Sequence, residues 1–161
     1  MKYIPLTQGY VAVVSDKDYA RCMQGYRWHV DVRKHRKTVY AIRQVYKHGK
    51  ISYQKLHRFI LSITDPVIKV DHRDGNGLHC NRRNLRVATT GDNQHNSRMP
   101  KHNTSGYKGV TWHKQRGKWH AQIALNRKHI SLGLHSTAKA AAKAYDTAAK
   151  QLFGKFARTN F

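Results

Sequence analysis

The sequence contains no glutamate. Its 161 residues include only 8 acidic side chains, all of them aspartate, against 31 lysines and arginines and 12 histidines, and the formal net charge is +23. An enzyme built on a glutamate base is therefore excluded, as are the zinc motifs H-E-x-x-H and H-x-E. So much positive charge on a small chain resists compaction unless it meets a polyanion, so nucleic acid is the expected partner.

Cysteines and long apolar runs are also scarce. Cys22 and Cys80 cannot form a four-ligand zinc site by themselves, and we expect free thiols in a reducing compartment. No segment is apolar enough to span a bilayer and none has the pattern of a basic amphipathic anchor, so we expect no membrane partner. The N-terminal segment lacks the pattern of a signal peptide, which favours an intracellular protein.

Charge divides the chain into three parts. Residues 1–60 carry 13 lysines and arginines and 3 aspartates, residues 61–98 carry 6 and 4, and residues 99–161 carry 12 and 1. A nearly neutral middle segment between two basic flanks suggests that its aspartates have a functional role between two surfaces that bind phosphate. We predict an N-terminal domain over 1–98, with a β-rich part over 1–50, then a polar linker at 99–104 and a C-terminal domain over 105–161.

The predicted fold class is α+β. Three segments of the N-terminal part have strand patterns: the apolar run Tyr10–Val14 and the alternating segments Tyr26–Val32 and Thr38–Tyr46. The last two predict a hairpin whose turn is Arg33–Lys37. Helices are expected after an N-cap at Ser15 or Asp16, and over Tyr53–Ile63.

The C-terminal part has a pattern of three strands and one helix. The expected strands are Tyr107–His113, Lys118–Leu125 and His129–Leu134, with turns at Gly117 and at Asn126-Arg127. The expected helix is Ser136–Phe153, capped by Ser136 or Thr137 and ended by Gly154. Its predicted apolar stripe is Ala141, Ala144, Tyr145, Ala148 and Leu152.

The segment from Val70 to Asn96 carries the most specific chemistry. It has the pattern of a strand, a Gly- and Asn-rich loop, a second short strand and a short helix. Phosphodiester hydrolysis needs an activated water and a cation. His72 is a suitable base, Asp71 and Asn93 offer hard oxygen ligands, and Asn84 can tie the loop backbone. Adjacent side chains face opposite sides of a regular strand, so Asp71 and His72 share a site only where the strand ends or twists.

This spacing resembles the HNH endonucleases of the ββα-metal class. Asp-His is followed by Asn 12 residues after the histidine and by Asn 21 residues after it. The resemblance is closest to the phage and intron-encoded homing branch. It implies His72 as general base, Asn84 as the structural middle residue, and Asp71 and Asn93 as ligands of one magnesium, with manganese as an alternative. It also implies 5′-phosphate and 3′-hydroxyl products, and no structural zinc, because no CxxC pair flanks the motif.

Leu56-His57-Arg58 also recurs in that branch. We include His57 and Arg58 among the candidate DNA-contact residues, although bracing or plain packing is the favoured role of His57. The alternative to a nuclease motif is an ordinary Asn- and Gly-rich turn, which needs no metal.

Residues 105–161 resemble the plant APETALA/ethylene-response-factor DNA-binding domain. The carrying residues include Tyr107-Lys108-Gly109-Val110, Gly117-Lys118-Trp119, Ala144-Tyr145-Asp146 and Asn160-Phe161. The resemblance implies a three-stranded sheet in the major groove with a helix behind it. The candidate DNA-contact residues of this part are Lys108, Thr111, Trp112, His113, Lys114, Arg116, Lys118, Arg127 and Lys128. Trp119 is expected in the core.

Three functions compete at this point. The first is a metal-dependent HNH homing-type DNA endonuclease of phage or mobile-element origin. The second is a non-catalytic, sequence-specific DNA-binding regulator with a degenerate HNH fold, and the third is an RNA-binding structural protein. We predict the endonuclease, acting on double-stranded DNA in the bacterial cytoplasm. The sequence leaves monomer and homodimer open.

Overall fold

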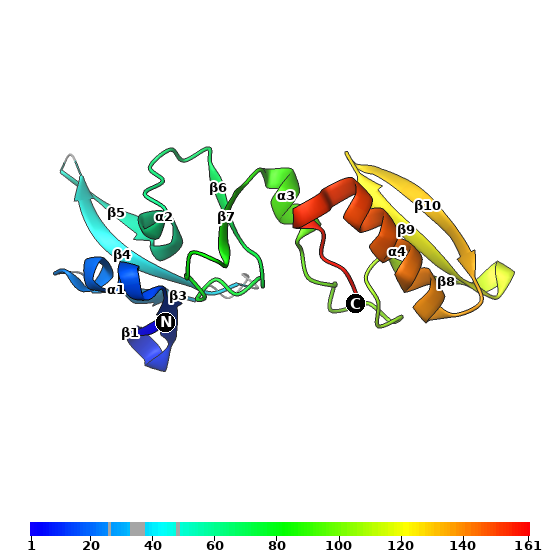
Figure 1. Ribbon diagram of the computed structural model, residues 1–161, viewed down its shortest axis with the longest axis horizontal. Coiled ribbons are helices and arrows are strands. Elements are labelled where there is room, and N and C mark those ends of the chain that lie inside the picture. Colours follow the sequence, from blue (N-terminus) through cyan, green and yellow to red (C-terminus); the bar gives the residue numbers. More distant parts are fainter. Residues whose placement is uncertain (26, 33–37, 48) are drawn as a thin grey trace. The chain divides into compact units, whose positions relative to one another are not determined.

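The chain forms two compact units. The computed structural model describes residues 1–25, 27–32, 38–47 and 49–161, and the chain divides into Met1–Thr90 and Gly91–Phe161. Both units combine antiparallel sheets with helices (Figure 1), as the predicted fold class requires. Each unit is described by itself below.

The first unit begins with a hairpin and a helix. β1 (Lys2–Pro5) pairs antiparallel with β2 (Val11–Val14), and η1 (Thr7–Gly9) joins them. α1 (Asp16–Met23) follows with Ser15 at its N-cap, as its sequence predicts. The Ser15 hydroxyl does not cap the helix, because it accepts a hydrogen bond from the Arg82 backbone amide at 3.0 Å.

A three-stranded sheet comes next, in the order β3-β4-β5. Its strands are β3 (His29–Asp31), β4 (Tyr40–Lys47) and β5 (Lys50–Lys55). β3 and β4 are antiparallel, as predicted, while Tyr26 and the predicted turn Arg33–Lys37 lie outside the described residues.

The helix predicted over Tyr53–Ile63 is shorter than expected. α2 covers only Leu56–Ile60, because Tyr53 pairs with Gln44 and continues β5. The chain leaves the helix at Ser62, whose φ of 56° is left-handed. The cross-strand pairing of Tyr53 therefore outweighs its place in the helical pattern.

Two further strands carry the motif segment. β6 (Lys69–His72) pairs antiparallel with β7 (Leu85–Ala88), and α3 (Thr90–His95) follows. The long loop between β6 and β7 is hydrogen-bonded to β2. Val13 N donates to Leu78 O at 2.9 Å, and Cys80 N donates to Val13 O at 2.7 Å. This strand, loop, strand and helix order agrees with the pattern predicted for Val70 to Asn96.

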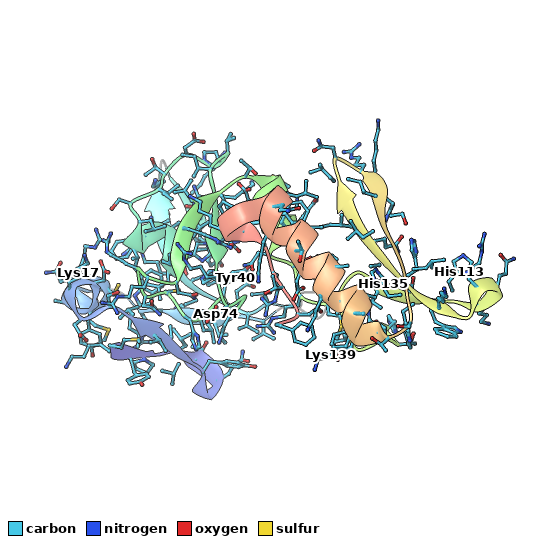
Figure 2. The ribbon with its side chains drawn as sticks, turned by 45° about the vertical axis from the view of Figure 1, so that its right-hand side comes forward. Lys17, Tyr40, Asp74, His113, His135 and Lys139 are labelled. Carbon is cyan, nitrogen blue, oxygen red and sulfur yellow. The ribbon has the colours of Figure 1, made fainter. Side chains whose placement is uncertain are left out.

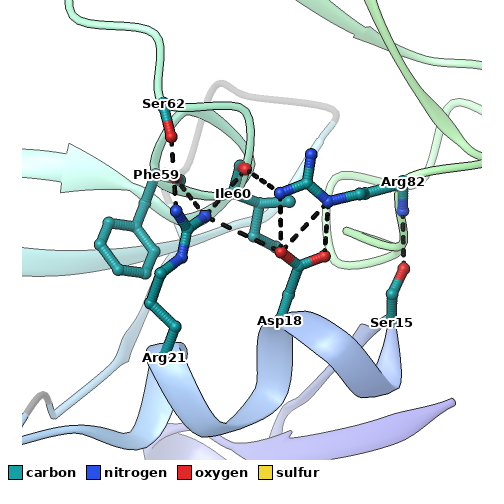
Figure 3. A network of polar contacts seen from close by, with 7 residues as sticks. All are labelled: Ser15, Asp18, Arg21, Phe59, Ile60, Ser62 and Arg82. Atoms are coloured by element: carbon teal, nitrogen blue, oxygen red, sulfur yellow. Dashed lines mark hydrogen bonds and ion pairs between the residues drawn. The ribbon is translucent and has the colours of Figure 1, made fainter.

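A polar network joins α1, α2 and this loop (Figure 3). The Asp18 carboxylate, 3% exposed, accepts bonds from Arg82 Nε and NH2 at 2.8–3.1 Å. Arg82 NH2 also donates to Ile60 O at 2.9 Å, and Arg21 NH2 donates to Phe59 O and Ile60 O. The last carbonyls of α2, which the helix itself cannot pair, are satisfied in this way. The apolar core lies beside this network and includes Ile4, Val14, Leu56 and Ile60.

The second unit is a three-stranded antiparallel sheet covered by one long helix. β8 (Val110–His113), β9 (Lys118–Leu125) and β10 (Lys128–His135) lie in the order β10-β9-β8, and η2 (Lys114–Arg116) joins the first two. α4 (Ala138–Phe153) lies across one face of this sheet (Figure 1), and η3 (Gly154–Phe156) follows it. The three strands and the helix predicted for this part are present, although the first strand begins only at Val110 and the helix at Ala138.

Local signals set the ends of these elements. The Thr137 hydroxyl accepts a bond from Ala140 N at 3.1 Å and so caps α4. Asn126 and Arg127 both have φ above 50°, which suits the two-residue turn between β9 and β10. Gly109 has φ +75°, and a Cβ there would lie 2.0 Å from the Tyr145 ring, so the sheet and α4 approach too closely for any side chain.

The apolar stripe of α4 differs in part from the prediction. Ala141 and Tyr145 are buried as expected, but Leu152 is 43% exposed and Phe153 is buried instead. Asp146 is also buried, because its carboxylate accepts bonds from Asn160 and from Phe161 N. Among the described residues, no helix has both the length and the apolar character needed to cross a membrane.

Candidate nucleic-acid interface

The open face of the β8–β10 sheet follows from strand register. Val110 pairs with Ala121, and both are buried against α4, so the next pair, Thr111 with His120, faces away from the helix. Continuing this alternation gives a surface that is polar except for two residues, Ala124 and Leu134. We call it the outer face: Thr111, His113, Lys118, His120, Gln122, Ala124, His129, Ser131 and Leu134.

Cations lie at both ends of β9. Lys114 and Arg116 are exposed in η2 at one end. At the other end Arg127 is exposed in the turn and Lys128 at the start of β10. Figure 2 shows His113 beside the η2 end, away from α4. Eight strand residues span roughly 23 Å, while the major groove of B-DNA is about 12 Å wide. Cations so far apart can reach phosphates on both sides of a groove whose bases face the sheet.

Trp112 lies on the other face of the sheet from the one the DNA-contact prediction requires. It pairs with Trp119, so both rings lie on the α4 side, 5.0 Å apart and edge to face. Trp112 is 47% exposed at the end of the sheet, while Trp119 packs against the core as predicted. By strand register Trp112 is therefore not part of the outer face.

Lys108 is held within its own unit. Its Nζ donates to His95 O at 2.9 Å and to Ser97 O at 2.8 Å, at the end of α3. Burial, with a smaller contribution from Arg158, lowers the pKa of Lys108 to about 8. In this arrangement the ammonium group bonds carbonyl oxygens of the helix end, where a positive charge is favourable.

Asp71 and His72 are the last two residues of β6. The two residues are 7% and 5% exposed. The Asp71 Oδ2 atom accepts a bond from Arg86 Nε at 2.7 Å and pairs with Arg86 NH2 at 2.5 Å. Arg86 lies opposite Asp71 on β7 and is itself buried. This charge-assisted pair holds the Asp71 carboxylate against β7.

His72 is enclosed. Burial lowers its pKa to about 4, although Asp74 and Asp71 act in the opposite direction. Its Nε2 atom lies 3.8 Å from Cys80 Sγ, and its ring meets that of His57 edge to face at 4.9 Å. The His72 imidazole is therefore buried and uncharged at neutral pH.

Asn84 makes the backbone ties that its place in the loop predicts. Its Oδ1 atom accepts from Asp74 N at 3.1 Å, and its Nδ2 atom donates to His79 O at 2.7 Å and to Asp74 Oδ1 at 3.0 Å. Asp74 also accepts from Asn76 N and pairs with His79. These bonds hold the two ends of the loop together, so Asn84 acts on the loop rather than on a reacting atom.

The remaining predicted site residues are dispersed. Asn93 lies on α3 in the second unit, and its juxtaposition with Asp71 stays a prediction. His57 is 5% exposed, so it packs inside the unit and does not reach a phosphate. Arg58 NH1 donates to Ile68 O at 2.6 Å, and its NH2 donates to Asp65 O, so Arg58 ties down the segment after α2.

Sequence reasoning missed two groups of residues. Gln122, His120 and Ser131 belong to the outer face, and simple alternation counted from the buried Val110 and Ala121 could have found them. Arg86 is the partner of Asp71, but no local signal marks it, because the pair forms across two strands 15 residues apart.

Comparison with known proteins adds two findings. An AP2 domain matches residues 105–155. Protein 3.8 of Escherichia phage T7 is 37% identical over 89 residues, which cover 55% of this chain and 73% of the phage protein. The chain belongs to the family of this phage protein. No solved structure matches the present chain.

Plant proteins match a smaller part of the chain. The AP2-like ethylene-responsive transcription factor TOE2 of Arabidopsis thaliana is 42% identical over 64 residues, 40% of this chain and 13% of its own length. APETALA2-like protein 2 of Oryza sativa subsp. indica is 42% identical over 64 residues, 40% of this chain and 15% of its own length. The chain thus spans a small fraction of these plant relatives.

These matches contradict the endonuclease prediction. The matched domain and the plant relatives are those of DNA-binding regulators, not of nucleases. The prediction that this chain is an HNH enzyme is therefore wrong. Spacing along the sequence also carries no information about Arg86, which pairs with Asp71 across two strands.

Proposed function

We propose that this protein is a non-catalytic regulator that binds double-stranded DNA sequence-specifically through its second unit. The observation that carries the proposal is the outer face of β8–β10, which is largely polar, free of α4 and flanked by exposed cations at both ends of β9. The AP2 match over 105–155 and the transcription-factor relatives support the same function.

The outer face has side chains suited to reading bases. Gln122 lies at its centre, paired with Ser131, and a glutamine amide can make two hydrogen bonds to adenine in the major groove. His113 and His120 lie on the same face, and His120 Nε2 is 2.8 Å from Ser131 Oγ. Lys118 and the turn cations would bind phosphates, which position the protein without reading sequence.

The first unit has a supporting role in this proposal. We propose that the segment from β6 to α3 has a degenerate sequence motif of HNH type, a proposal supported by the order and spacing of Asp71, His72, Asn84 and Asn93 along the chain. The proposed function has no catalytic step, so it requires neither a catalytic metal nor a general base at this place.

Selection from a random duplex library, followed by fluorescence anisotropy with the selected and a scrambled duplex, tests the proposal. We expect Gln122→Ala to lose about 1–3 kcal/mol of discrimination between the two duplexes. Lys118→Gln should weaken binding to both duplexes alike. The matched controls are Gln151→Ala and Lys143→Gln, whose side chains are exposed on α4, away from the outer face.

Two results would contradict the proposal. One is equal affinity of the wild-type protein for the selected and the scrambled duplex. The other is a loss of discrimination in Gln151→Ala as large as that in Gln122→Ala, because the reading surface would then not be the outer face.

A further inference from the structure

Three side chains with strong metal affinity meet inside the first unit. His57 comes from α2, His72 ends β6, and Cys80 lies in the loop between β6 and β7. One ligand atom from each lies within 4.8 Å of the other two. All three residues are buried, with exposures of 5%, 5% and 0%. Within the described part of the chain, no other group of histidine, cysteine and aspartate side chains meets this condition.

The hydrogen bonding of His57 points to an absent ligand. Its Nδ1 atom is fully buried and has no hydrogen-bond partner among the described residues. The ring is surrounded by aromatic contacts, with His72 at 4.9 Å and Tyr40 at 5.4 Å, and these give a ring nitrogen no acceptor or donor. A buried polar atom without a partner is costly, and a bound ion is one of the few things that would satisfy an imidazole nitrogen.

The donor set identifies the kind of ion. Two imidazole nitrogens and one thiolate are typical zinc ligands, whereas magnesium and calcium prefer oxygen. Tetrahedral zinc with bonds of about 2.0–2.3 Å places its ligand atoms roughly 3.5 Å apart. The 3.8 Å between Cys80 Sγ and His72 Nε2 is already close to this value, and small side-chain rotations would bring the third atom in.

We propose that His57, His72 and Cys80 bind one zinc ion, with water in the fourth position. The ion would join α2, the end of β6 and the β6–β7 loop, so it would stabilise the folded first unit without touching the outer face. This differs from the expectation of no structural zinc, which rested on the absence of a CxxC pair. The ligands come from three separate segments of the chain, so they cannot be recognised from a short sequence motif.

Cobalt substitution of the full-length chain, expressed without a histidine tag, provides the main test. Cobalt(II) bound by Cys80 should give a thiolate-to-cobalt charge-transfer band in the near ultraviolet, and one equivalent of zinc should abolish it. This band separates the proposed site from adventitious binding to the many other histidines. Zinc should also raise the melting temperature of the chelator-treated protein, because only the folded state holds the three ligands together.

Cys80→Ser should lose the charge-transfer band and weaken zinc binding at least about tenfold. The matched control is Cys22→Ser, since Cys22 is the other buried free cysteine and is not one of the three ligands. His57→Asn tests a second ligand, and circular dichroism of each metal-free variant reports whether it folds. If both variants fail to fold, the presence or absence of the charge-transfer band in the wild-type protein decides whether the site exists.

Two outcomes would overturn the proposal. One is a wild-type protein that gives no charge-transfer band and no melting shift with zinc. The other is a band that disappears in Cys22→Ser but survives in Cys80→Ser. DNA affinity of the second unit should be unchanged by zinc, so failure here and failure of the proposed function are separate results.

Discussion

At the scale of single residues, burial decides what a charged side chain does. Lys108 belongs to the matched AP2 segment and was a candidate for base contact, yet its ammonium group bonds two carbonyl oxygens at the end of α3. His57 and His72, the candidates for DNA contact and catalysis, are both buried in the first unit next to Cys80. Residue type predicts which chemistry is available, and the surroundings select one use.

Lys108 predicts an unusual rise of stability with pH. Its pKa is about 8 in the folded protein against an ordinary value of 10.5. As the pH rises above 8, the folded state loses this proton while the unfolded state keeps it, so the free energy of unfolding of the second unit should increase. The rise should end near pH 10, because burial raises the pKa of Tyr145 from 10.0 to about 12, which acts in the opposite direction above that pH.

Denaturant titrations in a Trp28→Phe background would measure this rise, because Trp112 and Trp119 then report on the second unit alone. Lys108→Met should flatten the profile between pH 8 and 10, whereas Lys101→Met, an exposed lysine, should leave the rise in place. An unchanged rise in Lys108→Met would show that another group causes it.

At the scale of elements, polar contacts between distant segments position the loop that carries the motif. The Asp18–Arg82 pair connects α1 to the β6–β7 loop, and Arg82 and Arg21 both donate to the carbonyl at the end of α2. Figure 3 shows that both arginines bond to Asp18 and to the end of α2. Because Asp18 is buried whereas the Arg82 side chain is 38% exposed, the loss of Arg82 leaves a poorly solvated carboxylate.

Arg82→Gln should therefore lower the free energy of unfolding of the first unit by about 1–3 kcal/mol. Urea unfolding followed by Trp28 fluorescence, with Trp112 and Trp119 replaced by phenylalanine, would measure it. Arg83→Gln is the matched control, because Arg83 is the exposed neighbour in the same loop. Equal effects of the two substitutions would mean that the bonds to Asp18 and Ile60 contribute little.

At the scale of the whole molecule, the charge of +23 sets how the protein meets DNA. Phosphate contacts release bound counterions, so affinity depends steeply on salt. The exposed cations at both ends of β9 are part of this charge, and they lie next to the face proposed to read bases.

If about 6–10 phosphates are neutralised, affinity should fall by roughly 10³–10⁵ between 50 and 200 mM salt. Arg116→Gln should reduce the slope of log affinity against log salt by about 1, and Lys143→Gln on α4 should leave it unchanged. Anisotropy titrations at several salt concentrations would provide the slopes, and a slope near zero in the wild type would rule out phosphate contact as the main source of affinity.

Much of the fold could be predicted from the sequence. β9, the Thr137 cap and the end of α4 at Gly154 follow from signals within a few residues of each other. The AP2-like segment was recognised for the same reason, since its strands, turns and helix are continuous in sequence. Local order and alternation were enough there, because neighbours in the chain are neighbours in the fold.

The motif segment shows where this reasoning stops. The sequence by itself determined a basic, nucleic-acid-binding protein with strands at β6 and β7 and an Asn84 tie between the loop ends. Only the tertiary structure decided that Asp71 meets Arg86, that Tyr53 continues β5, and that His57, His72 and Cys80 converge. These outcomes depend on contacts between segments far apart in the chain. The pattern of residue types along one segment does not show which distant residue will contact a buried side chain of that segment.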